Sequence, residues 1–300
     1  MYLDKFFLPI DREEELVAEQ AYKNNPVSPF IDNPYPCGIF AEKGLAEITF
    51  SKITVFYGGN GSGKSTLLNL IAQKLALNRI APFNSGETFD SYVEHCEYEL
   101  GYDDEGFRHR IPDGSRIITS DDIFDYMLTV RTNNEEITEN REDARDKWFD
   151  LKFGKSIQLK SMEDYDALRL QILARRKSLS RRQFVNRTAG QAVRMNSNGE
   201  TALSYFENRF RNDTLYCLDE PENSMSPKMQ LKFMDMLREM VRYCGGQFII
   251  ATHSPFLLSM ENAKIYDLDS SPVEVKNWWE LENVRIYHDF FQSHRSLFEN

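Results

Sequence analysis

The sequence predicts an α/β fold in which helices flank a mostly parallel β-sheet. Three short apolar segments support this expectation, and each runs directly into glycine or polar residues: 48–57, 214–218 and 247–252. Continuous runs of β-branched and aromatic residues are typical of strands buried on both faces. Between the last two segments, Lys228–Tyr243 shows the apolar spacing of a helix. Such alternation of strand, helix and strand is typical of a parallel sheet.

Length and composition indicate a globular protein of one large domain or two small ones. The chain has 300 residues, 41% of them hydrophobic, and a formal net charge of −11. Residues 1–20 lack the basic start and apolar length of a signal peptide. No uncharged apolar stretch approaches the roughly 18 residues of a membrane span, and the four cysteines show no metal-site spacing. We therefore expect a cytoplasmic protein that does not insert into a membrane.

A glycine-rich loop follows the first apolar segment and opens a helix. Residues 58–65 read Gly-Gly-Asn-Gly-Ser-Gly-Lys-Ser and match G-x-x-x-x-G-K-[ST]. Such a loop converges backbone N–H groups on phosphates, and the helix N-terminus adds partial positive charge. We expect Lys64 to reach the β- and γ-phosphates and Ser65 to ligate Mg²⁺. The predicted cofactors are ATP and Mg²⁺, with ATP-binding residues Gly58, Gly59, Asn60, Gly61, Ser62, Gly63, Lys64, Ser65 and Thr66.

Polar residues end the other two apolar segments. Asp219 is expected to hold Mg²⁺ directly or through water. Because side chains alternate along a strand, Glu220 is expected to face the γ-phosphate and to orient or deprotonate a water. His253 follows the neighbouring segment and is expected to hydrogen-bond both a phosphate oxygen and that water. The predicted catalytic residues are Glu220, His253 and Lys64.

Other elements are expected outside these motifs. A short strand is predicted over Arg116–Thr119 and a helix after Val284. Residues 84–115, rich in Gly, Asp, Glu and aromatics, are expected to form irregular surface structure or a small antiparallel element. Residues 123–204 hold long helix-forming side chains, which predicts a mainly helical subdomain. The aromatic tail after Asn277 is expected to pack in the core.

Motifs in a fixed order carry a family resemblance. They are the loop 58–65, Asn-Ser-Asn-Gly-Glu at 196–200, Asp-Glu at 219–220, Glu-Asn-Ser-Met-Ser-Pro at 222–227 and Ala-Thr-His-Ser-Pro at 251–255. In this order they resemble the Walker A loop, signature, Walker B motif, D-loop and switch histidine of ABC-type P-loop ATPases. The closest resemblance is to the SMC/RecF/OLD-like branch and its small stand-alone AAA/ABC ATPases.

The resemblance implies a P-loop NTPase fold and an assembly. The chain would be a single ABC-ATPase domain, 1–300, in two lobes: a nucleotide-binding core lobe of 1–122 and 205–300, and a helical signature lobe of 123–204. Ser197 and Gly199 would contact ATP bound to a second subunit, and Asn223 and Ser224 would lie in the D-loop at the same interface. One loop and one signature per chain then imply a homodimer that forms on ATP binding.

The sequence also departs from the family pattern. The signature is not Leu-Ser-Gly-Gly-Gln, and no glutamine occurs between Lys74 and Ile157, so Asp121 is the nearest match to the Q-loop residue and a further candidate Mg²⁺ ligand. Only 133 positions separate Lys64 from Ser197, too few for long coiled-coil arms. Tyr35 and Phe40 lie at suitable distances upstream to stack on adenine, but core packing is the competing explanation.

A basic segment precedes the signature. Ala167–Gly199 holds eight basic residues and no acidic one. Clustered arginines of this kind bind nucleic-acid phosphates. The competing explanations are a solvated helix face, pairing with the acidic 135–150 segment, and docking of an acidic partner protein. The candidate nucleic-acid or partner contacts are Arg175, Arg176, Lys177, Arg181 and Arg182.

The predicted function is Mg-dependent ATP binding and hydrolysis by an ATP-dimerised head that acts as a conformational switch. We expect a role in DNA maintenance or phage defence with a partner protein, for example a separately encoded nuclease. The alternative is the ATP-binding subunit of an ABC transporter, which the missing glutamine and the atypical signature disfavour. A P-loop kinase would leave Ser197, Gly199 and His253 without a role.

Overall fold

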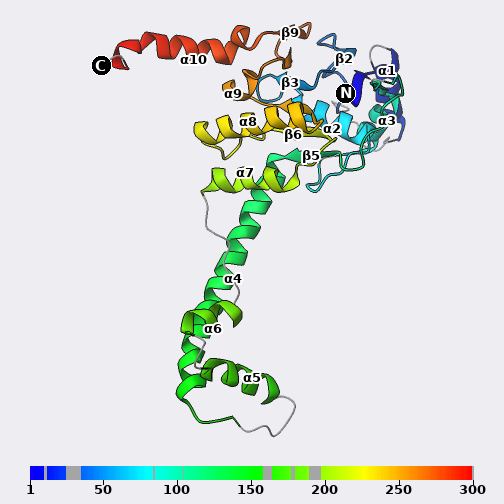
Figure 1. Cartoon of the computed structure of the whole chain (residues 1–300). Coiled ribbons are helices and arrows are strands. Elements are labelled where there is room, and N and C mark those ends of the chain that lie inside the picture. The colour runs from blue at the N-terminus through cyan, green and yellow to red at the C-terminus, as the bar shows by residue number, and fades with distance from the viewer. Residues whose placement is uncertain are drawn as a thin grey trace. The chain divides into compact units, whose positions relative to one another are not determined.

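Figure 1 shows the computed structural model of the chain, which describes residues 1–9, 12–24, 35–83, 85–103, 105–157, 164–176, 180–188 and 197–298. The chain divides into two compact units. Unit 1 comprises Met1–Ile123 and Asn198–Asn300, and unit 2 comprises Phe124–Ser197.

Unit 1 is built around a six-stranded sheet. Its strands are β3 (Ile53–Tyr57), β5 (Arg116–Thr119), β6 (Leu215–Asp219), β7 (Gln247–Ala251), β8 (Lys264–Asp267) and β9 (Glu274–Lys276). Their spatial order is β5-β6-β7-β3-β8-β9, and every neighbouring pair is parallel except β8–β9. All residues of β3 and β7 are buried, as expected for central strands covered on both sides. The predicted mostly parallel sheet is confirmed.

Helices cover both faces of the sheet, because alternate residues of each strand point to opposite sides. On one face, α2 (Lys64–Lys74) shares a buried cluster with Cys217 and Ile249. The other face is covered by α7 (Asn198–Arg209) and α8 (Pro227–Tyr243). Aromatic pairs with ring centroids 4.5–5.5 Å apart link α7 to α8, the residue after α7 to β6 and β7, and β6 to β7: Phe206–Phe233, Phe210–Tyr216, Phe210–Phe248 and Tyr216–Phe248.

A three-stranded antiparallel sheet, in the order β2-β1-β4, belongs to the same unit. It consists of β1 (Leu3–Phe7), β2 (Glu47–Thr49) and β4 (Glu97–Leu100), and its buried residues join the α2 cluster. The predicted small antiparallel element is therefore confirmed by β4. The expectation of irregular structure before it is wrong, because α3 (Glu87–His95) buries Phe89, Tyr92 and Val93 on one helical face. Neither β1 nor α1 (Arg12–Asn24) was expected from the sequence.

The prediction of one continuous strand over 48–57 is also wrong. The segment contributes β2 to the small sheet and β3 to the main sheet, with a break between them. At the break, Ser51 N–H donates to Thr54 Oγ1 at 3.0 Å. At the point where the chain passes from one sheet to the other, this backbone N–H is therefore satisfied by a local side chain.

Unit 2 is helical in the residues that are described. It contains most of α4 (Ser120–Phe153) together with α5 (Asp164–Arg175) and α6 (Arg181–Thr188). Its small buried cluster comprises Ala144, Trp148, Ala174, Phe184 and Val185. The predicted helical subdomain is confirmed.

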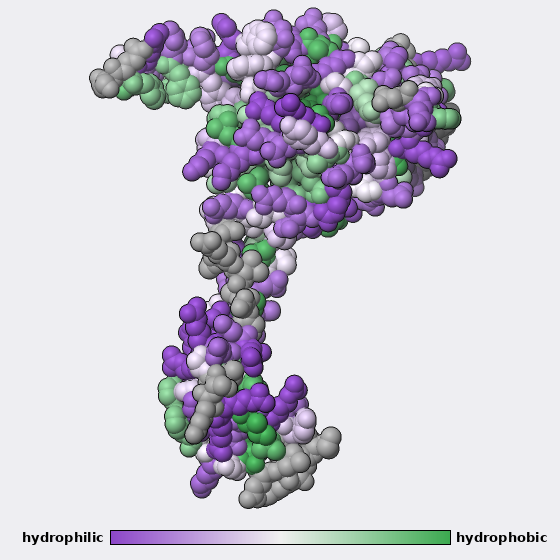
Figure 2. Space-filling view, viewed as in Figure 1, coloured by the Kyte–Doolittle hydropathy of each residue, from purple (hydrophilic) through white to green (hydrophobic). Residues whose placement is uncertain are grey.

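The C-terminal tail differs from its prediction. It forms a 3₁₀ turn (Trp278–Glu280), α10 (Glu282–Ser293) and a second 3₁₀ turn (Arg295–Leu297). The expectation that its aromatic residues pack in the core is wrong, because Trp279, Phe290 and Phe291 are more than half exposed. Figure 2 shows apolar side chains along α10 on the surface. No helix within the described residues combines the length and the apolar character needed to cross a membrane.

Candidate nucleotide site

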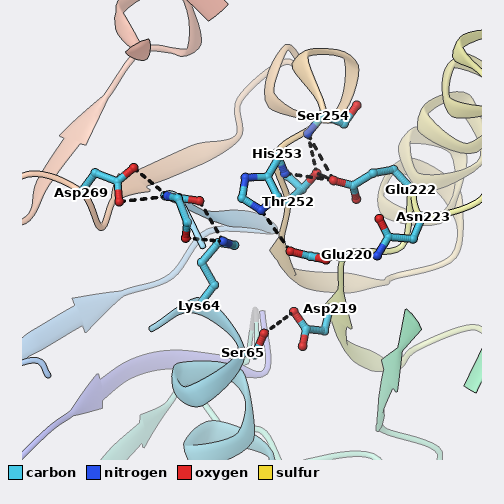
Figure 3. A network of polar contacts seen from close by, with 12 residues as sticks. Lys64, Ser65, Asp219, Glu220, Glu222, Asn223, Thr252, His253, Ser254 and Asp269 are labelled. Carbon is cyan, nitrogen blue, oxygen red and sulfur yellow. Dashed lines mark hydrogen bonds and ion pairs between the residues drawn. The ribbon is translucent and has the colours of Figure 1, made fainter. Parts of the chain in front are cut away.

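Loops that follow four strands meet at one edge of the main sheet. β3, β6, β7 and β8 run parallel, so their carboxyl ends lie at the same edge. The phosphate loop follows β3, Asp219 ends β6, His253 lies two residues after β7 and Asp269 lies two residues after β8. Figure 3 shows the side chains of Lys64, Asp219, Glu220 and His253 gathered there.

The phosphate loop has a geometry suited to an anion. Gly63 has a φ of 101°, and a Cβ atom at this position would lie 2.9 Å from Ile39 Cγ2, so only glycine fits. α2 begins at Lys64, so the first backbone N–H groups of this helix have no acceptor within the helix. Ser62 Oγ is buried and has no hydrogen-bond partner among the residues that the structure describes. These donors fit the phosphates of a nucleotide.

Lys64 is held beneath this loop. Its Nζ donates hydrogen bonds to the carbonyl oxygens of Gly58 at 2.8 Å and Gly59 at 3.0 Å, and the residue is only 5% exposed. Burial lowers the pKa of Lys64, while Glu220 and Asp219 oppose that shift. The ammonium group therefore lies next to the carboxylates that the sequence predicts for the site.

Two charged residues that sequence reasoning missed brace the phosphate loop. Both carboxylate oxygens of Asp269 accept hydrogen bonds from the Gly59 N–H, at 2.7 and 2.9 Å. Lys43 Nζ donates to the carbonyl oxygens of Ser62 and Leu268, both at 2.7 Å. The signal for Asp269 is the same as for Asp219, an acidic residue after an apolar strand, whereas nothing in the sequence marks Lys43.

The predicted Mg²⁺ ligands Ser65 and Asp219 lie together. Ser65 Oγ donates to Asp219 Oδ1 at 3.0 Å. Burial raises the pKa of Asp219 to about 6, and the hydrogen bond from Ser65 partly offsets this effect. A hydroxyl and a carboxylate are the oxygen donors that Mg²⁺ prefers, so the pair fits the ion. Bound Mg²⁺ would neutralise phosphate charge at this position.

The raised pKa predicts a pH-dependent response to Mg²⁺. Without metal, the folded chain holds a proton on Asp219 between about pH 4 and 6, so this group's contribution to stability is lost as pH rises through about 6. Mg²⁺ requires the deprotonated carboxylate. The increase in Tm that MgCl₂ adds in the presence of ATP should therefore grow from pH 5 to pH 8.

Thermal unfolding with and without MgCl₂, at constant ATP, measures this increase. The Asp219→Asn variant is the control, because it retains only the pH response of the nucleotide itself. An equal Mg²⁺ increment at pH 5 and pH 8 in the wild-type chain would contradict the prediction.

The side chain of Glu220 is held by a residue of its own loop after β6 and by a residue of the loop after β7. Its Oε1 lies 3.0 Å from Nε2 of His253, and its Oε2 accepts a hydrogen bond from Asn223 Nδ2 at 3.0 Å. Glu220 has a φ of 47°, in the left-handed region that non-glycine residues rarely adopt. Its backbone N–H donates to the carbonyl oxygen of Ala251 at 2.9 Å. A carboxylate beside an imidazole is an arrangement that can orient a water and take its proton.

The structure separates the two candidates for adenine stacking. Phe40 is fully buried, and its ring packs against Gly63. Tyr35 is 43% exposed, stacks on Phe89 with a centroid distance of 5.8 Å, and its hydroxyl donates to Thr66 Oγ1 at 3.0 Å. Tyr35 therefore offers an accessible ring at the start of α2, and Phe40 does not.

The signature residues lie at the start of α7. Ser197 is exposed and immediately precedes the helix, whereas Asn196 lies outside the described residues. Gly199 is buried, and a Cβ atom there would lie 3.1 Å from Met229 Cγ and 3.4 Å from Ser224 O. The start of α7 thus packs directly on the D-loop, whose residue Ser224 has a φ of 71°.

Asp121 and Asp122 at the start of α4 differ in exposure and in hydrogen bonding. Asp121 is exposed in the first turn of α4, and no side-chain partner is recorded for it among the described residues. Asp122 is 5% exposed and accepts hydrogen bonds from the N–H groups of Thr119 and Ala81, both at 2.8 Å. Thr119 pairs with Asp219 in the parallel register, so α4 begins close to the Walker B strand. Asp122 caps α4, and Asp121 faces solvent.

The side chains of the basic segment differ in their contacts: some bind other parts of unit 2 and some are exposed. The guanidinium of Arg175 donates to Gly154 O at 2.6 Å and Ser156 Oγ at 2.7 Å, so this side chain caps the end of α4. Arg181 lies over the ring of Phe149. Arg176 and Arg182 are exposed and have no recorded side-chain partner in the part of unit 2 that is described. Lys177 lies outside the described residues.

The fold and the site together define a P-loop nucleoside triphosphatase: a parallel sheet carries a phosphate loop, a serine–aspartate pair and a glutamate–histidine pair at one edge. A family model described as "ABC transporter" matches residues 46–223, more than half of the chain. The chain therefore belongs to the ABC-type ATPases, a family whose members generally hydrolyse ATP. A second model, described as "AAA domain, putative AbiEii toxin, Type IV TA system", matches residues 201–259.

Several solved structures are similar to the chain at low identity. The SMC head domain from Thermotoga maritima is 15% identical, with 92% of this chain and 99% of that chain covered and a TM-score of 0.37. The dimeric ATP-binding cassette MJ0796 bound to ADP and Pi is 15% identical, with coverages of 77% and 88% and a TM-score of 0.35. Stu0660 of Streptococcus thermophilus is 13% identical, with coverages of 91% and 76% and a TM-score of 0.40. No curated protein matches the chain.

Proposed function

We propose that the chain binds and hydrolyses ATP with Mg²⁺ and acts as a conformational switch. The observation that carries this proposal is the hydrogen-bonded Glu220–His253 pair beside Lys64 and the Ser65–Asp219 pair. Lys64 and the loop N–H groups would bind the phosphates, Ser65 and Asp219 would hold Mg²⁺, and Glu220 would take a proton from water. Tyr35 would stack on the adenine ring.

Phosphate release tests this proposal directly. The purified chain is incubated with ATP, with Mg²⁺ and with EDTA, and inorganic phosphate is measured over time. Release that depends on Mg²⁺ supports the proposal. Release no faster than that of a Lys64→Ala preparation would contradict it.

We also propose that two chains close on ATP as a head-to-tail homodimer. Ser197 and Gly199 of one core would meet the nucleotide of the other, with Asn223 and Ser224 in the same interface. The close packing of Gly199 on Ser224 supports this idea, because signature and D-loop then form one surface. The two lobes predicted at 123–204 and in the remainder would carry the switch. A mass that doubles with ATP but not with ADP in sedimentation velocity would support the dimer.

The biological role belongs to the same proposal. A role in DNA maintenance or phage defence with a partner protein is supported by the toxin–antitoxin description of the model that matches 201–259. The alternative, the ATP-binding subunit of a transporter, is supported by the description of the model that matches 46–223. Neighbouring genes separate the two: a nuclease or reverse transcriptase favours defence, and a permease favours transport.

A nucleic-acid contact is favoured by one feature of unit 2. A cavity of about 1050 Å³ lies between α4, α5 and α6. Its lining includes four basic side chains and two acidic ones: Lys147, Arg169, Arg176, Arg187, Asp143 and Asp166. Residues 124–197 are net positive in a chain whose net charge is −11. We call this cavity between α4, α5 and α6 the groove of unit 2. We propose that the groove, rather than Arg175, binds phosphates of nucleic acid.

Charge reversal at one groove residue provides the test. Arg176→Glu should weaken binding of a fluorescent single-stranded oligonucleotide about tenfold at low salt and flatten the dependence of affinity on salt. Arg182→Glu is the comparison variant: Arg182 is a candidate contact in the sequence, but it is exposed and lies outside the groove lining, so the groove proposal expects a smaller loss of affinity there. Fluorescence anisotropy at several salt concentrations gives both quantities. Equal affinities for the two variants would exclude the groove, and no binding by the wild-type chain would exclude the contact altogether.

A further inference from the structure

A single buried carboxylate joins the loop that carries Glu220 to the loop that carries His253. Oε1 of Glu222 accepts hydrogen bonds from Thr252 Oγ1 at 2.6 Å, from the His253 N–H at 2.9 Å and from the Ser254 N–H at 3.2 Å. Glu222 is 9% exposed. Figure 3 shows these bonds converging on one carboxylate oxygen. The proposed ATP hydrolysis gives Glu222 no role in binding phosphate or Mg²⁺ or in accepting a proton from water.

The bonds determine where His253 lies. Its backbone N–H is held by Glu222, and its ring nitrogen Nε2 lies 3.0 Å from Glu220 Oε1. Glu220 and Glu222 belong to the same loop after β6. Glu222 thus binds the backbone of His253, while Glu220, two residues earlier in the same loop, contacts the imidazole ring of His253.

A second bridge reinforces this connection. Ser254 Oγ donates to Gln230 Oε1 at 2.6 Å, and Gln230 Nε2 donates to Met225 O at 3.0 Å. Met225 lies in the D-loop segment, where its Cα would be 3.6 Å from a Cβ atom on Gly199. Residues 252–254 are thus bound to the D-loop segment in two ways: directly through Glu222, and through Gln230 to Met225. The D-loop segment in turn contacts Gly199 at the start of α7.

The hydrogen bonds at Glu222 compensate for the burial of its carboxylate. Taking a carboxylate out of water is costly unless donors replace the lost hydration. Three donors do so at Oε1, and burial still raises the pKa of Glu222. Oε2 of Glu222 is buried, and within the described part of the chain it has no hydrogen-bond partner. An apolar side chain would fill the same space without this penalty, but it would leave the three donors of 252–254 without an acceptor.

We propose that Glu222 is a positioning residue for hydrolysis: it fixes the His253 loop on the D-loop so that His253 and Glu220 stay paired. This inference rests on the proposed ATP hydrolysis at the site. Because Glu222 is buried and its hydrogen bonds go to residues 252–254, its replacement should affect kcat and leave the binding of ATP unchanged.

Three variants separate positioning from general stability. Glu222→Ala removes the acceptor and should lower kcat about thirtyfold or more while KM for ATP stays within about threefold, because small misplacements of a reacting group are costly. Glu222→Gln keeps an accepting Oε1 and replaces only the oxygen that has no recorded partner, so kcat should stay within about threefold of wild type. Thr252→Val removes one donor and keeps the carboxylate, and it should give an intermediate kcat.

An NMR signal reports on the histidine without hydrolysis. The ¹H–¹³Cε1 signal of His253, assigned with a His253→Gln variant, depends on the contact with Glu220. In Glu222→Ala it should move to the position found in Glu220→Ala, and in Glu222→Gln it should stay near the wild-type position. If Glu222→Ala does not fold, Glu222→Gln and Thr252→Val still provide the comparison.

The possible outcomes are distinct. Wild-type kcat in Glu222→Ala, an equal loss in Glu222→Gln and Glu222→Ala, or an unmoved His253 signal in both Glu222→Ala and Thr252→Val would each overturn the positioning role. A wild-type chain that releases no phosphate would instead overturn the proposed function, and the NMR comparison would still report on the role of Glu222.

Discussion

Replacing Glu220 with glutamine is expected to lower kcat for ATP hydrolysis by about a hundredfold or more. Glutamine keeps the size of the side chain and can still contact His253 and Asn223, which hold the carboxylate at 3.0 Å on either side. It cannot accept a proton from water. ATP binding should therefore persist, and because hydrolysis would no longer release the closed state, an ATP-bound dimer should accumulate.

Two measurements check this result on the same preparation. Phosphate release gives kcat, and sedimentation velocity with ATP and Mg²⁺ gives the fraction of dimer. Glu239→Gln is the matched control, because it makes the same change on an exposed residue of α8 and should leave both values unchanged. Hydrolysis at the wild-type rate in Glu220→Gln would remove Glu220 from the mechanism.

Replacing Lys64 with alanine is expected to weaken ATP binding about a hundredfold. Lys64 is buried next to Asp219 and Glu220, and its ammonium is the positive charge nearest to them in the phosphate loop. Loss of two charge-assisted hydrogen bonds to phosphate costs about 3 kcal/mol. That cost corresponds to about two orders of magnitude in Kd.

Isothermal titration calorimetry with ATP measures this loss. Lys74→Ala is the control, since Lys74 lies at the other end of α2 and donates to Glu94 O. Because Lys64 also donates to the carbonyl oxygens of Gly58 and Gly59, circular dichroism is used to check that the variant keeps the overall helix content of the wild-type chain. An unchanged Kd in a folded Lys64→Ala variant would be inconsistent with the proposed phosphate site.

The meeting of the candidate site residues at one edge of the sheet was predictable from the sequence, because these residues belong to short motifs at strand ends. The spacing around Lys64 and the acidic pair after 214–218 indicate the site without knowledge of distant contacts. The strands within 214–218 and 247–252 were predictable because buried parallel strands are continuous runs of apolar residues in the sequence.

What could not be predicted depends on contacts between distant segments. Asp269 and Gly59 are 210 positions apart, and Glu222 and His253 are 31 apart, so no local pattern links them. The break at Ser51 coincides with side-chain hydrogen bonds to Thr54 and from the distant Gln247, which no periodic pattern in the sequence indicates. The aromatic residues of α10 look like core residues in sequence, but the described part of unit 1 leaves them exposed.

The left-handed backbone conformation of Glu220 lowers the stability of the folded chain. A residue with a Cβ atom at a φ of 47° costs about 1–2 kcal/mol relative to glycine. A chain optimised for stability alone would place glycine or asparagine there. With glutamate there, the chain is less stable by this amount at the residue for which we propose proton transfer. The proposed role and the cost in stability therefore meet at one backbone dihedral angle.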